Sequence, residues 1–234
     1  MKIALLGYGR MGKAIESIAK ERGHEIVAKI DKDNPNDSIQ KADVAINFSV
    51  PSSAATNITH GLNQGIPVVC GTTGWLEHKT AIEKLCIDTN GAFLYASNFS
   101  LGVNLFFALN KKLAEMMAPY NQYKVAIEEI HHTEKLDAPS GTAITLAEGI
   151  LPYSQHNGWK LEKSASENDI PIKAIREPNV PGTHTVTYRS DIDKIHIEHL
   201  AHNRDGFALG AVIAAEWIIG KSGIFTMSDV LNIT

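Results

Sequence analysis

Residues 2–31, KIALLGYGRMGKAIESIAKERGHEIVAKID, decide the fold of this chain. The apolar run at 2–6 predicts a short buried strand, and residues 13–22 place apolar side chains on one side of a predicted helix. Gly23 ends that helix, and residues 25–30 predict a second strand. The stretch is therefore a strand–turn–helix–strand unit.

The turn after the first predicted strand is a GxGxxG motif, Gly7-Tyr8-Gly9-Arg10-Met11-Gly12. Its first glycine permits the tight turn, the second lets the backbone approach a pyrophosphate, and the third lets the helix pack against the strand. The free N–H groups and the dipole of the helix start favour a diphosphate. Asp31 ends the second predicted strand, where a carboxylate reaches the ribose hydroxyls of adenosine. The unit predicts a dinucleotide site made by these six residues and Asp31.

The charges beside this motif bear on the choice of dinucleotide. Asp31 would repel a 2′-phosphate, which favours NADH. Lys32 and Arg10 could offset that repulsion, or they could be ordinary solvated surface charges. We therefore expect NADH as the cofactor, with NADPH also accepted.

The alternation of strands and helices continues to residue 98. Further strands are predicted at 43–48, 66–70 and 92–96, with helices at about 53–64 and 77–88 between them. Regular alternation with short connections is typical of a parallel sheet with right-handed crossovers. Because loops at the carboxyl ends of parallel strands line a cofactor crevice, we expect two loops to contribute, Asn47-Phe48-Ser49 and Gly71-Thr72-Thr73-Gly74.

The pattern changes after residue 98. A helix near 103–118, a strand at 123–130 and a helix at 140–150 are followed by several strands within 160–200. In those strands Val186 and Tyr188 alternate with Thr185 and Thr187, and Ile195 and Ile197 alternate with His196 and Glu198, which is typical of a sheet with one covered face. A final helix at 207–220 is apolar nearly all round, so it should be buried.

We therefore predict an α/β protein with a Rossmann-type parallel sheet domain and a smaller α+β domain with a mixed open sheet. The first domain should be residues 1–98, completed by 204–234, and should bind the dinucleotide. The second should be residues 99–203.

The composition of the 234-residue chain limits its partners. A net charge of −4 argues against a general binder of nucleic acid or of anionic membranes. Cys70 and Cys86 stand in apolar surroundings without a metal-ligand spacing, so we expect two buried reduced thiols and no metal. No apolar stretch approaches the roughly 20 residues that span a bilayer, and we expect a cytoplasmic protein.

The densest polar cluster follows the strand at 123–130. His131 and His132 precede Lys135 and a predicted helix start at Ser140-Gly141-Thr142. A histidine can donate a proton near neutral pH, a lysine supplies a fixed positive charge, and N–H groups at a helix start can hold a carboxylate. These are the groups that a reductase of a dicarboxylate needs, although ordinary histidines in a solvated loop would give the same pattern.

At this cluster the sequence resembles the dihydrodipicolinate reductases (4-hydroxy-tetrahydrodipicolinate reductases) of lysine and diaminopimelate biosynthesis. The family pattern E-x-H-H-x-x-K-x-D-A-P-S-G-T-A is matched from Glu129 through Ala143. Three further blocks match, Gly9-Arg10-Met11-Gly12, Gly71-Thr72-Thr73-Gly74 and Ala96-Ser97-Asn98-Phe99-Ser100-Leu101-Gly102-Val103-Asn104. The resemblance covers nearly the whole chain.

The resemblance implies roles for these residues. His131 would donate the proton, Lys135 would act with it as second donor and charge, and His132 would contact the substrate. Gly141 and Thr142 would bind a substrate carboxylate, together with the N–H of Ser140 at the same helix start. The nicotinamide side would be lined by Ala96, Ser97, Asn98 and Phe99.

The implied reaction is hydride transfer from NAD(P)H to C4 of an unsaturated cyclic dicarboxylate, followed by protonation. The resemblance also implies a homotetramer joined through the sheet of the second domain. Arg204 stands where the chain returns to the first domain, and it would either touch cofactor or substrate or form a structural ion pair.

The chain departs from the family pattern in three places. The segment between Asp31 and Asp43 is short, the first glycine block has one residue fewer, and residues 176–184 contain extra prolines. Two other interpretations fit the first half of the chain, a nucleotide-sensing regulator and a relative of amino-acid or homoserine dehydrogenases. The pair His131 and Lys135 beside a carboxylate-binding helix start argues against the regulator. The dehydrogenases share the first half but not the His-His-x-x-Lys and Asp-Ala-Pro-Ser-Gly-Thr run.

Overall fold

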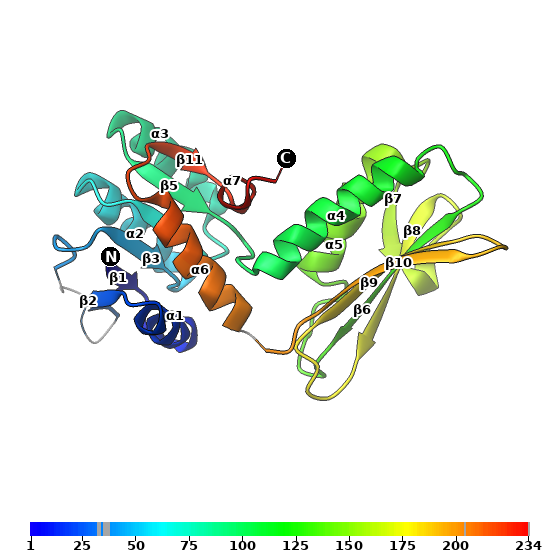
Figure 1. Cartoon of the computed structure of the whole chain (residues 1–234), viewed down its shortest axis with the longest axis horizontal. Coiled ribbons are helices and arrows are strands. Elements are labelled where there is room, and N and C mark those ends of the chain that lie inside the picture. Colours follow the sequence, from blue (N-terminus) through cyan, green and yellow to red (C-terminus); the bar gives the residue numbers. More distant parts are fainter. Residues whose placement is uncertain (32–33, 35–37, 204, 234) are drawn as a thin grey trace. The chain divides into compact units, whose positions relative to one another are not determined.

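The computed structural model describes residues 1–31, 34, 38–203 and 205–233. The chain forms two compact units (Figure 1). Unit 1 comprises Met1–Leu101 and Asp205–Thr234, and unit 2 comprises Gly102–Arg204. The N- and C-terminal parts of the chain therefore belong to the same unit.

Unit 1 contains a six-stranded sheet in which every neighbouring pair is parallel. Its order is β11-β5-β4-β3-β1-β2, which confirms the predicted Rossmann-type sheet. The strands are β1 (Lys2–Leu6), β2 (Glu25–Ile30), β3 (Val44–Asn47), β4 (Val68–Cys70), β5 (Ala92–Tyr95) and β11 (Gly223–Phe225). The sequence pattern did not predict β11, because three residues are too few to show a period.

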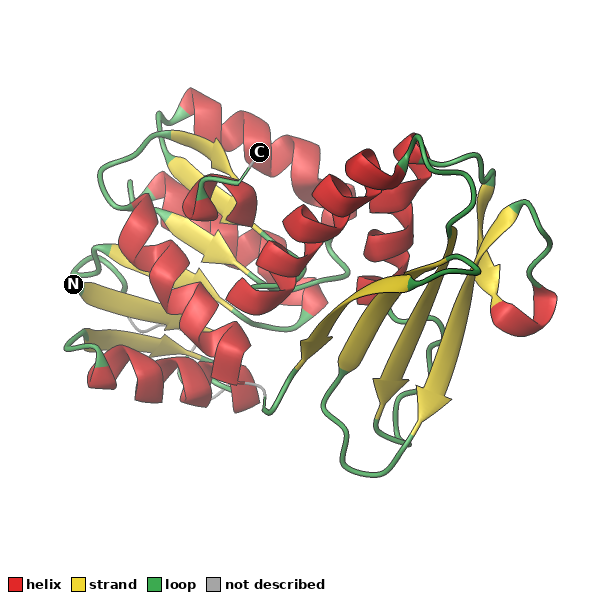
Figure 2. Cartoon of the chain, turned by 45° about the vertical axis from the view of Figure 1, so that its right-hand side comes forward, coloured by secondary structure: helices red, strands yellow, loops and turns green. Residues whose placement is uncertain are grey.

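Helices cover both faces of this sheet (Figure 2). Along β1, Ile3 and Leu5 pack in one core and Ala4 and Leu6 in the other, because successive side chains point to opposite faces. The first core is closed by α1 (Arg10–Glu21), α6 (Asp205–Ile218) and α7 (Met227–Leu231). The second is closed by α2 (Pro51–Asn63) and α3 (Lys79–Asp88), the latter preceded by a 3-10 turn, η1 (Leu76–His78).

Helix α6 confirms the prediction of a buried C-terminal helix. Seven of its residues are buried, and they are mostly alanine, valine and glycine. A Cβ at Gly210 would lie 1.7 Å from the carbonyl oxygen of Phe99, so only glycine allows this approach between the helix and the segment after β5.

Unit 2 contains a mixed five-stranded sheet of order β10-β9-β6-β8-β7. Strand β6 pairs in parallel with β8 and antiparallel with β9. The elements are α4 (Leu101–Met117), β6 (Lys124–His131), α5 (Gly141–Ile150), η2 (Leu151–Tyr153), β7 (Gly158–Leu161), η3 (Glu162–Ser164), β8 (Asp169–Arg176), β9 (Thr183–Arg189) and β10 (Lys194–Leu200).

Helices α4 and α5 pack on one face of this sheet and form its core with residues such as Ile127, Ile172 and Val186. The alternation predicted in β9 is confirmed, because Val186 and Tyr188 are buried while Thr185 and Thr187 are partly exposed. The expectation for β10 is wrong in part. Ile195 is 41% exposed, because β10 is an edge strand that the core helices do not reach at this position.

Both cysteines are free and buried, as predicted. Burial raises the pKa of the Cys70 thiol to about 11, which keeps it protonated and unreactive. Among the described residues, no helix is long and apolar enough to cross a membrane.

Candidate active site

The glycine turn of unit 1 borders a cavity of about 620 Å³. Gly7 follows β1 with φ +105°, and its N–H donates to the carbonyl of Ile30 at 2.8 Å, which ties the turn to the end of β2. A Cβ at Gly12 would lie 2.4 Å from the carbonyl oxygen of Gly7, so α1 packs against the turn as the motif predicts. The cavity is lined by Gly7, Tyr8, Gly9, Ile30, Asp31, Phe48, Ser49, Val50, Ser53 and Asn57.

The start of α1 has the features of a diphosphate site. Gly9 is the N-cap and provides no side-chain cap, so the first N–H groups of the helix are left for a ligand. Among the described residues, no atom of another part of the chain lies within 4 Å of the position that a Cβ of Gly9 would take. The backbone is therefore open to a ligand at the position where the motif expects a pyrophosphate.

Tyr8 is fixed at the wall of this cavity by a charged network. Its hydroxyl donates to Glu16 and accepts from Lys29 Nζ at 3.0 Å, and Lys29 Nζ lies 4.4 Å from the centre of its ring. Lys29 and Lys20 form ion pairs with Glu16 at 2.8 and 2.7 Å. Hydrogen bonds from Lys20, Lys29 and Tyr8 lower the pKa of the Glu16 carboxyl to about 2, so the network stays charged.

The loop after β4 is held against the loop after β3. Thr72 is buried, and its hydroxyl accepts from the N–H of Ser49 at 2.9 Å. A Cβ at Gly71 would lie 2.2 Å from the Phe48 ring. Gly71 and Thr72 thus shape the rim of the unit 1 sheet, whereas Thr73 is exposed.

The segment after β5 presents little side-chain surface. Phe99 is 1% exposed and its ring packs 5.5 Å from that of Phe48, so only its backbone is available to a cofactor. The Asn98 side chain accepts from the N–H of Ser100 at 2.9 Å, which fixes the turn, and Ser97 is exposed. Two further sequence predictions, Lys32 and Arg204, lie outside the described residues.

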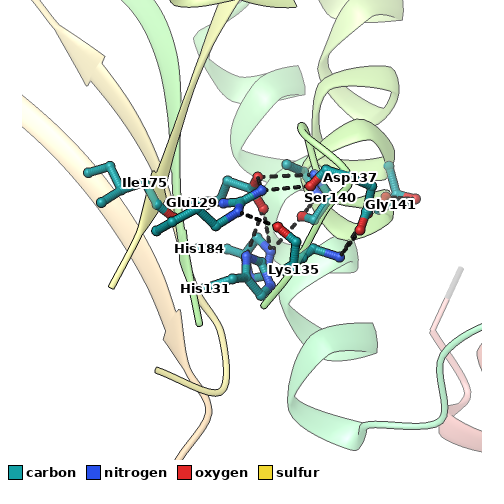
Figure 3. Close-up of polar contacts among 11 residues, drawn as sticks. Glu129, His131, Lys135, Asp137, Ser140, Gly141, Ile175 and His184 are labelled. Carbon is teal, nitrogen blue, oxygen red and sulfur yellow. Dashed lines mark hydrogen bonds and ion pairs between the residues drawn. The ribbon is translucent and has the colours of Figure 1, made fainter. Parts of the chain in front are cut away.

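In unit 2 a buried carboxylate organises the polar cluster (Figure 3). Glu129 is fully buried on β6. Its Oε1 accepts from the N–H of Ser140 at 3.1 Å and from Arg176 Nη2 at 3.2 Å, and its Oε2 lies 2.9 Å from His131 Nδ1. Although desolvation opposes ionisation, the contacts with His131 and Ser140 lower the pKa of Glu129 to about 2. The carboxylate is therefore charged at neutral pH.

Lys135 lies in the loop after β6, and its ammonium group bonds both oxygens of Asp137, at 2.9 and 2.8 Å. Arg176, at the end of β8, fixes this loop through the carbonyls of Lys135 at 3.2 Å and Asp137 at 2.7 Å. The Asp137 carboxylate is exposed, so a substrate carboxylate can replace it as the partner of Lys135.

Ser140 caps α5, which begins at Gly141, one residue after the predicted start. Its Oγ accepts from the N–H of Ala143 at 3.2 Å and lies 3.1 Å from His184 Nε2. Ser140 is 2% exposed and its N–H is taken by Glu129, so that N–H is not free for a carboxylate. The N–H groups of Gly141 and Thr142 remain in the first turn, and nothing lies within 4 Å of a Cβ built on Gly141.

Sequence reasoning assigned no role to Glu129, Arg176 or His184. Glu129, His131 and His184 each place a ligand atom within 4.8 Å of the others, a donor set that can hold a divalent metal. Arg176 already neutralises Glu129, which weakens the attraction of this carboxylate for a cation.

Burial of His184 makes the stability of the protein depend on pH. Desolvation and the neighbouring His131 lower the pKa of His184 to about 3. Because the unfolded chain binds this proton more readily, the stabilisation is complete above the unfolded value near 6.5 and is lost as pH falls toward 3.

Between pH 7 and pH 4.5 the native protein should lose about 2 kcal/mol more unfolding free energy than His184→Gln. Urea unfolding at both pH values measures this, with the exposed His196→Gln as control. Equal losses in native protein and His184→Gln would contradict it.

Two models of known protein families match this chain. Residues 1–99 match the family model "Dihydrodipicolinate reductase, N-terminus", and residues 102–231 match "Dihydrodipicolinate reductase, C-terminus". The boundary between the two matches falls next to the division between the structural units.

Curated relatives align over the full length. The chain is 59% identical over 235 residues to a 4-hydroxy-tetrahydrodipicolinate reductase of Christiangramia forsetii, covering 99% of this chain and 98% of that protein. It is 33% identical over 244 residues to the Alkaliphilus metalliredigens protein of the same name, covering both completely. Among solved structures, a dipicolinate-bound dihydrodipicolinate reductase from Paenisporosarcina sp. TG-14 has the same fold, with a TM-score of 0.78, 23% identity and 97% of each chain covered.

Proposed function

The chain belongs to the dihydrodipicolinate reductase family, and we propose that His131 and Lys135 carry out its chemistry. It is an NAD(P)H-dependent oxidoreductase that reduces 4-hydroxy-tetrahydrodipicolinate in diaminopimelate and lysine biosynthesis. The observation that carries the proposal is the arrangement of unit 2. His131 is the last residue of β6, and its Nδ1 lies 2.9 Å from the carboxylate of Glu129, which also accepts from the N–H of Ser140 before α5. Arg176 binds the same carboxylate and holds the loop of Lys135 through the Lys135 carbonyl.

We assign the dinucleotide to unit 1. The N–H groups at the start of α1 hold the diphosphate and Asp31 holds the adenosine ribose, supported by the open position at Gly9 and by the cavity that Asp31 lines. When bound, the reduced nicotinamide supplies the hydride. Its surroundings are formed by the loop segments Gly71-Thr72-Thr73 and Ala96-Ser97-Asn98-Phe99.

We assign the dicarboxylate to unit 2. The N–H groups of Gly141 and Thr142 bind one carboxylate. The ammonium group of Lys135 leaves the Asp137 carboxylate and binds the substrate in its place. His132 contacts the substrate. His131 donates the proton that completes the reduction after hydride reaches C4, and Lys135 stabilises the negative charge that develops.

The carboxylate of Asp31 should set the preference for NADH. Asp31→Ser removes a hydrogen-bond acceptor for the ribose and a negative charge that repels a 2′-phosphate. The ratio of kcat/KM for NADPH to that for NADH should rise by about tenfold or more, which corresponds to about 1.4 kcal/mol. Steady-state kinetics with both cofactors measure the ratio, and Asp88→Ser, on the exposed side of α3, is the control. An unchanged ratio in Asp31→Ser would remove Asp31 from the cofactor site.

We also propose a cytoplasmic homotetramer joined through the open face of the unit 2 sheet. A groove lined by residues of β6, β8 and β9, including Ala126, Thr185 and Thr187, lies on this face. Light scattering coupled to size exclusion should give four times the chain mass of 25.5 kDa. A monomeric mass would contradict the assembly.

The activity test uses the purified protein, NADH and freshly made product of dihydrodipicolinate synthase. Loss of nicotinamide absorbance is expected, and its absence under conditions where NADH binds would overturn the function. Full turnover by His131→Gln would overturn the role of His131 alone.

A further inference from the structure

His131 has a fixed carboxylate on one side of its ring. Glu129 stands two residues earlier on β6, so both side chains point to the same face of the sheet. Within the described part of the chain, Glu129 Oε2 and His131 Nδ1 are buried and have no hydrogen-bond partner, yet they lie 2.9 Å apart, within reach of a bond when Nδ1 carries the hydrogen. The other oxygen is occupied by Ser140 and Arg176, which prevents the carboxylate from turning away.

The opposite nitrogen of His131 has different surroundings. A Cβ built on Gly182, just before β9, would lie 3.1 Å from His131 Nε2 and 3.4 Å from Cδ2 of the same ring. Because glycine has no side chain, no Cβ at this position crowds Nε2. Nδ1 thus faces an anion, and Nε2 faces the space that Gly182 leaves.

We propose that Glu129 is the positioning residue of this reductase: it holds the Nδ1–H of His131, so that His131 donates its proton to the substrate from Nε2. This inference rests on the function proposed above for His131. The proton leaves Nε2, the neutral ring keeps its hydrogen on Nδ1, and the Glu129 carboxylate remains ionised throughout. Such a carboxylate fixes the tautomer of a catalytic histidine and stabilises its charged form.

Three other charged or titratable groups surround the pair. Arg176 on β8 pairs with Oε1 of Glu129 and with loop carbonyls, so Oε2 is left to His131. His184 on β9 has its Nε2 3.9 Å from Oε2 and 3.1 Å from Ser140 Oγ, and its low pKa keeps it neutral. Lys135 follows in the loop after β6 and pairs with Asp137. Among the described charged groups, the Glu129 carboxylate is the one within hydrogen-bond distance of His131 Nδ1, at 2.9 Å.

Glu129→Gln tests the proposal, because glutamine has the same shape. Its amide oxygen can still accept from Ser140 and Arg176, and its NH₂ group then faces Nδ1 and donates to it. The neutral His131 ring must therefore move its hydrogen to Nε2. We expect kcat to fall by roughly 10²–10⁴-fold with KM changed only a few-fold, since the neutral form left after proton transfer has lost its acceptor.

Two measurements separate positioning from simple structural support. Nitrogen NMR of ¹⁵N-histidine-labelled protein, at a pH where the ring is neutral, should show the His131 hydrogen on Nδ1 in the native enzyme and on Nε2 in Glu129→Gln. Glu129→Asp, which keeps the charge, should recover part of kcat and the native tautomer.

Glu148→Gln is the matched control, because this glutamate of α5 is exposed and lies outside both the polar cluster and the proposed interface. It should leave kcat and the His131 tautomer unchanged. A native tautomer with the hydrogen on Nε2 would overturn the proposal, and this measurement needs no variant to fold. Native kcat in Glu129→Gln would also overturn it; if His131→Gln is inactive in that case, the proposed function stands and only the role of Glu129 falls.

Discussion

Lys135→Ala should lower kcat by roughly 10²–10⁴-fold while the protein stays folded. Among the described residues, the Lys135 ammonium group pairs with the exposed carboxylate of Asp137, so its loss leaves no buried charge without a partner. The ammonium group of Lys135 is nevertheless expected to matter in the reaction, because it is the lysine or arginine charge closest in sequence to His131. A charge placed where negative charge develops stabilises the transition state more than the bound substrate. Stopped-flow or steady-state kinetics with NADH give kcat, and thermal unfolding checks the fold.

Two further lysine variants make this test sharper. Lys135→Arg keeps the charge and loses an easily donated proton, so it separates electrostatic stabilisation from proton donation. Lys163→Ala, an exposed lysine of η3, is the control and should leave kcat unchanged. A kcat for Lys135→Ala within a factor of two of the native value would exclude Lys135 from the chemistry.

Gly7→Ala should destabilise the protein by about 2–5 kcal/mol and abolish tight binding of NADH. Gly7 has φ +105°, which an alanine adopts only with strain, and its Cβ would lie 2.2 Å from the carbonyl oxygen of Phe48. That contact is with backbone, so the connection between β3 and α2 has to move, and the same connection lines the cofactor cavity. Urea unfolding and NADH fluorescence titration measure the two effects.

Gly9→Ala is the comparison variant. Substitution of Gly7 should lower the stability of the free protein, whereas substitution of Gly9 should lower only its affinity for NADH. No atom lies within 4 Å of a Cβ at Gly9, so the free protein should keep its unfolding free energy within about 1 kcal/mol. The added methyl group would occupy the space of the pyrophosphate, and NADH affinity should fall by about tenfold or more. Equal stability losses in both variants, with NADH affinity retained in Gly9→Ala, would refute the proposed position of the diphosphate.

Local sequence patterns were enough to predict most of the fold. The strands of unit 1 are buried on both faces and flanked by turn residues, so their apolar runs identify them, and the glycine motif fixed the connection between β1 and α1. Short strands and edge strands were harder to predict from the sequence. Strand β11 has three residues, and Ile195 alternates like a core residue although β10 pairs only with β9.

The candidate site of unit 2 depends on pairings that sequence spacing does not contain. In the sheet, Glu129 lies opposite His184 on β9, and His131 lies beside Arg176 on β8. These contacts join residues 45 or more positions apart, whereas the sequence cluster ran only from 129 to 143. The histidine and the lysine were therefore predicted, and the groups that hold them in place were not.

The burial of side chains also shows which residues of a motif can contact a ligand, which the motif alone does not show. Phe99 and Ser140 both belong to blocks that match the family, and the structure buries both side chains. A residue can be part of such a block because it packs or caps a helix next to the site. Sequence identity alone does not distinguish this from contact with a ligand.

The return of the chain to unit 1 has a consequence for its synthesis. Helix α6 provides seven buried residues of unit 1, and β11 provides the last strand of its sheet, yet both follow residue 204. Unit 2 is continuous, so all of it has left the ribosome before the core of unit 1 is complete. On a translating ribosome the second unit in the sequence is therefore the first that can finish folding, and the glycine turn made at the start must wait for the final thirty or so residues.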